Sequence, residues 1–208
     1  KLQAKEPESL EIWRRMIEHS KGYFHRIYSA LDVTLTDDDL AGESTYDAQL
    51  AGICEELVEL GLAVESEGAL CVFPEGFTGR EGKPLPLIVR KSDGGYGYAT
   101  TDLATIKHRA RTLGADEILY VVGASQALHF KMIFWAAKAA GWLTREDGSE
   151  VPPIHVQIGS VLGEDGKILR TRSGAPLRLS WLLDEAVEKA GTVVAQSRPD
   201  LSDDERAV

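Results

Sequence analysis

The sequence predicts an α/β fold in which half of a parallel, doubly wound sheet follows a mixed α+β portion. Three observations lead to this prediction. The apolar runs of the second portion are short and continuous, as in strands buried on both faces. They alternate with amphipathic helical segments. Glycines stand where these helices should end. The resulting order, βαβαβ, is that of a nucleotide-binding half-sheet.

The first portion, as far as residue 84, is predicted to hold helices and a hairpin. The expected elements are a helix over 10–31, a helix over 46–60 and a hairpin over 62–73. Gly22 interrupts the first helical pattern and would be the point of any break, whereas Gly61 should end the second helix. The hairpin should turn at Glu67 and Gly68. No obvious catalytic chemistry stands in this portion.

The second portion supplies the predicted parallel sheet. Its expected strands are 85–89, 118–122 and 154–158, joined by helices over 103–113 and 126–140 that end at Gly114 and Gly141. Ligands of such sheets bind beyond the carboxyl ends of the strands. The candidate segments are therefore 94–102, 123–129 and 159–174, whose polar, glycine-rich character suits a ligand site and an exposed loop equally well. A last helix is expected over 181–190.

Composition excludes several classes of protein. With 208 residues, 43% hydrophobic and 27% charged, the chain is neither collagen-like nor disordered. Its two cysteines, Cys54 and Cys71, form no Cys-x-x-Cys pair and the histidines do not cluster, so we expect buried thiols and no metal site. Acidic residues outnumber basic ones by 33 to 23, giving a net charge of -10. Nucleic-acid contact must therefore be local, and DNA is not an expected partner.

The location of the protein and the extent of the chain can also be predicted. No apolar run long enough for a membrane span and no signal peptide occur, so we expect a cytoplasmic protein without a membrane partner. The chain does not begin with Met, and residues 202–205 have the pattern of a capping box at the start of another helix. We therefore expect it to be a fragment of a larger protein.

Neither common phosphate-binding loop is present. A Walker loop ending at Gly166 and Lys167 would need Gly at 161 and Ser or Thr at 168, where Val161 and Ile168 stand. The dinucleotide fingerprint would need a third glycine where Thr100 stands. Any nucleotide site must use another device.

Polar side chains gather at two predicted strand ends. Tyr98 and Asp102, four residues apart, would offer a phenol and a carboxylate to a planar cation. The alternative is that Thr101 or Asp102 only caps the following helix. Gln126 and His129 begin the next helix, after Ser125 as a suitable cap, although a histidine in such a place is more often a surface residue.

A basic segment follows the last predicted strand. Residues 167–178 contain four basic side chains and no acidic one, in an otherwise acidic protein. Such a glycine-flanked loop could hold a polyphosphate as charge develops at the α-phosphorus. A solvated loop is the equally weighted alternative.

Taken in order, these segments resemble arginyl-tRNA synthetases. The matching residues are 13, 42–46, 97–104, 120–123, 126, 129, 155, 159, 166–174 and 182–186. The resemblance covers nearly the whole chain, while the chain covers only a middle part of such an enzyme. It implies the second half of a Rossmann-like class I catalytic fold, which with ATP converts arginine to arginyl-adenylate and then transfers it to tRNA(Arg). The implied parts are a connective insertion (1–84), the half-fold (85–179) and the start of a helical tRNA-binding domain (180–208).

The resemblance also implies roles for single residues. Those reading the arginine side chain would be Tyr98, Asp102 and Gln126. Those contacting ATP would be His129, His155, Gly159, Lys167 and Gly174. The catalytic loop that replaces the Lys-Met-Ser-Lys-Ser signature would be Arg170, Thr171, Arg172 and Ser173. Mg²⁺ would accompany ATP, without a protein metal site.

The sequence departs from the family pattern in two places. Arg170 stands where Lys is common, which predicts an altered rate. No His-x-Gly-His signature occurs, so the 208-residue chain alone should be inactive. Two alternatives stay open: a stand-alone binding or regulatory module that keeps the synthetase shape, and another adenylate-forming or nucleotidyl-transfer enzyme.

Overall fold

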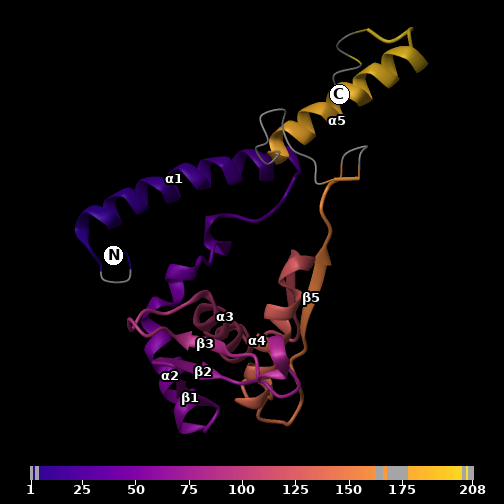
Figure 1. Ribbon diagram of the computed structural model, residues 1–208. Coiled ribbons are helices and arrows are strands. Elements are labelled where there is room, and N and C mark those ends of the chain that lie inside the picture. Colours follow the sequence, from indigo (N-terminus) through magenta and orange to yellow (C-terminus); the bar gives the residue numbers. More distant parts are fainter. Residues whose placement is uncertain (1, 3–4, 163–165, 168–177, 203–204, 206–208) are drawn as a thin grey trace. The chain divides into compact units, whose positions relative to one another are not determined.

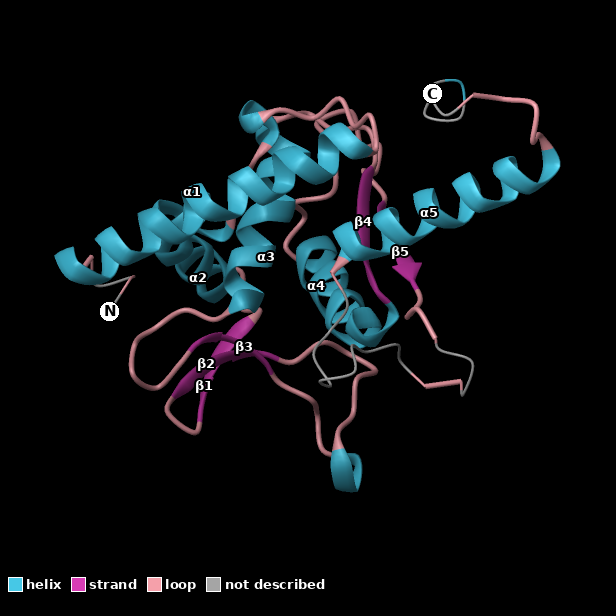
Figure 2. Cartoon of the chain, turned by 90° about the horizontal axis from the view of Figure 1, so that it is seen from above, coloured by secondary structure: helices cyan, strands magenta, loops and turns pink. Residues whose placement is uncertain are grey.

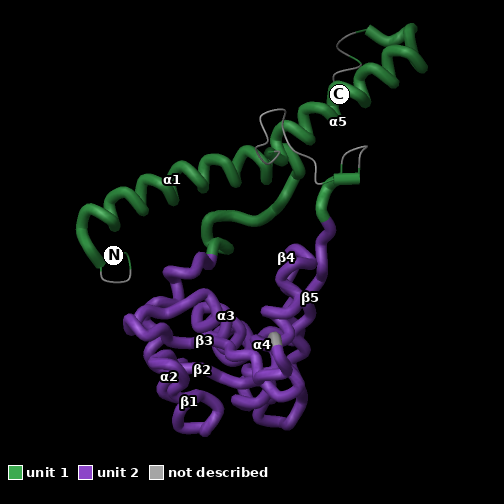
Figure 3. Tube along the Cα trace, viewed as in Figure 1, with its two compact units in different colours: residues 1–40, 160–208 green, residues 41–159 purple. Residues whose placement is uncertain are grey.

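The computed structural model describes residues 2, 5–162, 166–167, 178–202 and 205. These residues form two compact units, one of residues 41–159 and one of residues 1–40 together with 160–208 (Figure 3). Among them, no helix has the combination of length and apolar character that a membrane span requires. The predicted boundaries after residues 84 and 179 remain predictions.

An antiparallel sheet forms one side of the 41–159 unit. Its strands are β1 (Ala63–Ser66), β2 (Ala69–Val72) and β3 (Leu87–Arg90), in the order β1-β2-β3. Glu67 and Gly68, between β1 and β2, have φ angles of 52° and 79°. Two consecutive positive φ angles are what a two-residue hairpin turn of type I′ requires. The predicted hairpin and its turn are therefore confirmed.

The prediction for residues 85–89 is wrong in one respect. They were expected to form the first strand of the parallel sheet, but β3 pairs antiparallel with β2, with Cys71 opposite Ile88. Leu87 and Val89 are buried whereas Ile88 is 45% exposed. This alternation belongs to a strand with one solvated face, as antiparallel sheets commonly have.

The parallel part of the fold consists of β4 (Ile118–Gly123) and β5 (Pro153–Ile158), paired in parallel. Helix α4 (Ala127–Ala139) connects them and packs on one face of the pair (Figure 1). Tyr120 and His155 are register partners, and the ring of each lies 4.9 Å from the ring of Phe130 in α4. This parallel β-α-β unit confirms the predicted α/β class.

Helices α2 (Leu50–Glu59) and α3 (Tyr98–Lys107) share a core with the antiparallel sheet (Figure 2). Leu57, Leu103 and Ile106 are fully buried there. A 3-10 segment (Glu43–Gln49) precedes α2, and a π-helical turn (His108–Thr112) continues α3. The predicted stop signals are confirmed, because the glycines that follow α2, the π-turn and α4 have positive φ: they are Gly61, Gly114 and Gly141.

Two helix starts differ from the prediction. Helix α3 begins at Tyr98, not near 103, and its N-cap residue is Gly97. Asp102 and Thr101 therefore lie inside the helix and do not cap it. Helix α4 has Gln126 as its N-cap residue, without a side-chain capping bond, so Ser125 is not the cap. A 3-10 turn (Ala124–Gln126) occupies the position expected for the first helical residues.

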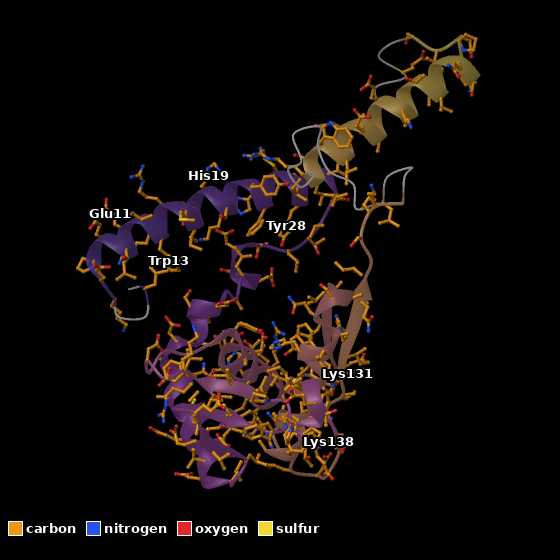
Figure 4. All side chains as sticks on the ribbon, viewed as in Figure 1. Glu11, Trp13, His19, Tyr28, Lys131 and Lys138 are labelled. Carbon is orange, nitrogen blue, oxygen red and sulfur yellow. The ribbon has the colours of Figure 1, made fainter. Side chains whose placement is uncertain are left out.

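The other unit contains the two longest helices, α1 (Pro7–Ala30) and α5 (Leu179–Ser197). Gly22 does not break α1, and α5 extends beyond the expected 181–190. Figure 4 shows His19 projecting from one side of α1 and Trp13 and Tyr28 from the other. Within α1 only Ile27 is buried, whereas Met16 is 64% exposed.

Candidate active site

A cleft of about 800 Å³ opens in the 41–159 unit beside the start of α3. Four segments contribute to its walls: the 3-10 segment before α2, the chain around β3, the start of α3, and the first turns of α4 with the turn before them. Most of the lining is apolar. Its residues are Glu43, Leu85, Pro86, Leu87, Ile88, Lys91, Tyr96, Gly97, Tyr98, Ala99, Ser125, Leu128, His129 and Met132.

Local structure between β3 and α3 brings Tyr98 to this cleft. Gly94 has a φ of 81°, and the backbone N–H of Gly95 donates to Asp93 Oδ1 at 2.9 Å, which closes a tight turn. The buried hydroxyl of Thr100 then donates to the carbonyl of Val89, fastening the first turn of α3 to β3. The chain thus reverses, and the helix start faces the cleft.

Asp102 and His129 form the main polar contact of this region. His129 Nε2 lies 2.6 Å from Asp102 Oδ2, with side-chain exposures of 13% for His129 and 30% for Asp102. The rings of His129 and Tyr98 are 4.8 Å apart. Since Tyr98 and Asp102 are separated by one helical turn, they share a face of α3. His129 contacts both.

The residues predicted to read arginine are brought together only in part. Tyr98 lines the cleft and is 66% exposed. Asp102 does not line the cleft, but it contacts His129, which does. Gln126 is exposed, does not line the cleft, and its side chain makes no hydrogen bond with the residues that the structure describes.

The residues predicted to contact ATP have different surroundings. His129 belongs to the pair with Asp102, and His155 donates from Nε2 to the carbonyl of Val122 at 3.0 Å. Gly159 directly follows β5 and is exposed, as is Lys167. The remaining predicted residues lie outside the described part of the chain: Arg170, Thr171, Arg172, Ser173 and Gly174.

Tyr120 lies in the core behind this site. Burial raises the pKa of its phenol to about 12, against a smaller lowering effect from the positive charge of Arg109. The Arg109 guanidinium carbon lies 5.0 Å from the centroid of the Tyr120 ring. The Tyr120 hydroxyl makes no hydrogen bond of normal geometry with the described residues, although the N–H groups of Arg109 lie near enough to lower the phenol pKa further. The described ranges also contain no group of three or more metal-ligating side chains.

Sequence reasoning missed two charged residues of the cleft and the central contact. Both Glu43, which is acidic, and Lys91, which is basic, line the cleft. The signal for Glu43 was its place in the segment 42–46, which resembles the synthetase family. The Asp102–His129 pair joins residues 27 positions apart, so no local spacing could reveal it.

Comparison with known proteins places this geometry in a family. The family described as class I (R) tRNA synthetases, catalytic domain, matches residues 1–208. An arginine–tRNA ligase of Thermobifida fusca is 66% identical over 206 residues, which cover 99% of this chain and 35% of that protein. An arginine–tRNA ligase of Nostoc punctiforme is 50% identical over 190 residues, covering 91% and 31%. The chain thus spans about a third of the length of these curated relatives.

Solved structures show the same similarity. Arginyl-tRNA synthetase from Plasmodium falciparum superposes with a TM-score of 0.76 at 29% identity, covering 96% of this chain and 31% of that one. The Thermus thermophilus arginyl-tRNA synthetase superposes with a TM-score of 0.56 at 20% identity over 77% of this chain, a likeness of fold alone. The chain therefore belongs to the family of class I (R) tRNA synthetases and lies within their catalytic domain.

Proposed function

We propose that the full-length protein containing this chain is an arginine–tRNA ligase. Two relatives with that name match 91% or more of the chain. Residues 1–84 would form the connective insertion, 85–179 the second half of the catalytic fold and 180–208 the start of a helical domain that contacts tRNA. Both relatives are ligases, so they give no support to a stand-alone binding module.

The observation that carries the proposal is a carboxylate held beside a mainly apolar cleft. Asp102 is 30% exposed, and its Oδ1 makes no hydrogen bond with the described residues. A guanidinium is a planar cation whose N–H groups match the two oxygens of a carboxylate. The apolar walls suit the aliphatic stem of an arginine side chain, and Tyr98 can cover it.

The proposed reaction has two steps. A carboxylate oxygen of arginine attacks the α-phosphorus of ATP, forming an acyl–phosphate bond while the bond to the β-phosphate breaks and pyrophosphate leaves. A hydroxyl at the 3′ end of tRNA(Arg) then attacks the acyl carbon, which releases AMP. Neither step needs a side-chain nucleophile, so positioning and electrostatic stabilisation dominate catalysis.

Charged residues after β5 would serve the phosphates. Arg170 and Arg172 supply cations in the segment assigned to the catalytic loop, with Lys167 nearby in sequence. Mg²⁺ would enter with ATP, because a magnesium ion is usually held by substrate phosphates and a few carboxylates. His155 and Gly159 would border the adenosine through the end of β5.

Arginine-dependent ATP–pyrophosphate exchange by the full-length enzyme tests this function. Asp102→Asn should reduce kcat/KM for arginine roughly a hundredfold to several thousandfold, about 3–5 kcal/mol, because the guanidinium loses its counter-charge. Asp116→Asn is a matched control, since Asp116 pairs with Arg145 and does not line the cleft. Unchanged arginine dependence in Asp102→Asn would remove the assignment of this carboxylate. Equal exchange with lysine or ornithine would point to another adenylate-forming enzyme.

A further inference from the structure

His129 has a contact that its predicted role in ATP binding does not explain. Its Nε2 lies 2.6 Å from Asp102 Oδ2, so this nitrogen already donates to a carboxylate. The ring also lines the cleft. His129 therefore stands between the cleft and Asp102, on the side proposed to hold the amino acid.

The imidazole has little freedom to leave this position. Its ring packs between Tyr98, with centroids 4.8 Å apart, and Phe130, with centroids 5.4 Å apart. Phe130 is itself buried against the rings of Tyr120 and His155. The side chain of His129 is only 13% exposed. A ring that is enclosed in this way keeps its donor atom at one place.

A fixed donor at Oδ2 determines how Asp102 presents its other oxygen. The terminal torsion of an aspartate side chain is broad, so an unrestrained carboxylate rotates within its rotamer. Guanidinium recognition depends on a shared plane, because the fork of N–H groups must meet carboxylate oxygens in that plane. A bond from His129 to one lone pair of Oδ2 stops this rotation. It leaves Oδ1 and the second lone pair of Oδ2 in a fixed plane for the guanidinium.

We propose that His129 is a positioning residue that holds the plane of the Asp102 carboxylate for the arginine guanidinium. This inference rests on the proposed function. It reassigns His129 from the nucleotide to the amino-acid side of the site. His129 variants should then change KM for arginine and leave KM for ATP near its original value.

Three substitutions in the full-length enzyme test the inference by pyrophosphate exchange. His129→Ala removes the donor, and we expect KM for arginine to rise roughly 10- to 100-fold, as when other orienting partners are lost. Glutamine can place an amide nitrogen near the position of Nε2, whereas asparagine is too short. His129→Gln should therefore stay within a few-fold of the original KM, and His129→Asn should resemble His129→Ala.

The Asp102→Ala background provides a second test, because alanine offers His129 no side-chain acceptor. If His129 acts only through Asp102, adding His129→Ala to Asp102→Ala should change arginine use by less than about threefold. The contact can also be observed without activity in the 208-residue chain. The ¹⁵N resonances of the His129 ring should move when Asp102 becomes Asn, because the acceptor of its N–H changes.

The possible outcomes distinguish a failure of this inference from a failure of the proposed function. A raised KM for ATP with an unchanged KM for arginine would overturn the inference in favour of an ATP contact. The same KM for arginine in His129→Ala, His129→Asn and His129→Gln would also overturn it, because the inference requires glutamine to differ from the other two. Should His129→Ala fail to fold, the comparison of Gln with Asn and the ring resonances decide. An original enzyme without arginine-dependent exchange would end the proposed function and this inference together, and the resonances would still report on the pair.

Discussion

At the scale of single residues, Tyr120 combines deep burial with an unpaired hydroxyl. The residue is 6% exposed, and its hydroxyl makes no hydrogen bond of normal geometry with the described residues. A buried polar group without a partner costs about 1–3 kcal/mol of stability. The Arg109 guanidinium packs over the ring instead, as a cation above an aromatic face.

Tyr120→Phe should therefore leave stability unchanged or raise it by about 1 kcal/mol, since the ring contacts are kept and only the unpaired hydroxyl is lost. Urea denaturation of the 208-residue chain at pH 7 measures this. A loss above about 1 kcal/mol would show that the hydroxyl has a partner. The raised pKa of about 12 also predicts how the stability difference between the two proteins depends on pH. Because the unfolded phenol ionises first, the variant's advantage should grow as pH rises from 10 to 12.

The residue scale also shows what local spacing can predict. Tyr98 and Asp102 could be paired from the sequence because four residues make one helical turn. The contact of Asp102 with His129 could not, since it depends on how α3 and α4, which β4 separates along the chain, pack against each other. Gln126 stands only three positions before His129, but the 3-10 turn before α4 leaves it exposed.

At the scale of secondary structure, Glu56 connects α2 to the end of α3 and to the segment after α4. From α2 its carboxylate accepts hydrogen bonds from Lys107 at the end of α3 and, at 2.7 Å, from Nε1 of Trp142 after α4. The Lys107 ammonium lies 5.3 Å from the Trp142 ring. Burial alone would raise the pKa of Glu56, but these hydrogen bonds outweigh that effect and hold it below its usual range.

Glu56→Ala should cost about 1–2 kcal/mol at pH 7, because Trp142 and Lys107 lose their shared acceptor in a partly exposed setting. The lowered pKa fixes the pH dependence. The stabilisation is fully present above the unfolded pKa near 4.5 and disappears as pH falls through the folded value. Urea denaturation between pH 3 and 7 checks this against Glu59→Ala, an exposed control on the same helix. A difference that persists at pH 3 would contradict the carboxylate explanation.

Elements differ in how far the sequence predicts them. The β1–β2 hairpin follows from Glu67 and Gly68 because the turn's backbone angles demand such residues. The direction of β3 does not follow, since an apolar run carries no mark of its partner strand. The start of α3 was also missed, because threonines favour strands. Here Thr100 and Thr105 are accommodated by donating to the carbonyls of Val89 and Thr101.

At the scale of the whole molecule, the parallel strand pair has one uncovered apolar face. Residues 118 and 120 of β4 are buried towards α4, whereas Leu119 and Val121 are 55% and 60% exposed. Their register partners, Ile154 and Val156, are 39% and 40% exposed, and Ile158 continues the row at 50%. Parallel sheets normally bury both faces. A contiguous apolar patch of this kind promotes association.

We therefore expect the 208-residue chain to self-associate through the outer face of β4 and β5. Sedimentation velocity over a range of micromolar concentrations should show oligomers that increase with concentration. Val121→Thr combined with Val156→Thr should shift the distribution towards monomer, because both substitutions place hydroxyls on this face at little cost to strand formation. Val64→Thr with Ile88→Thr is the matched control, since these exposed residues belong to the antiparallel sheet. A monomer at every concentration would contradict the expectation, and equal relief by the control pair would place the contact on the other sheet.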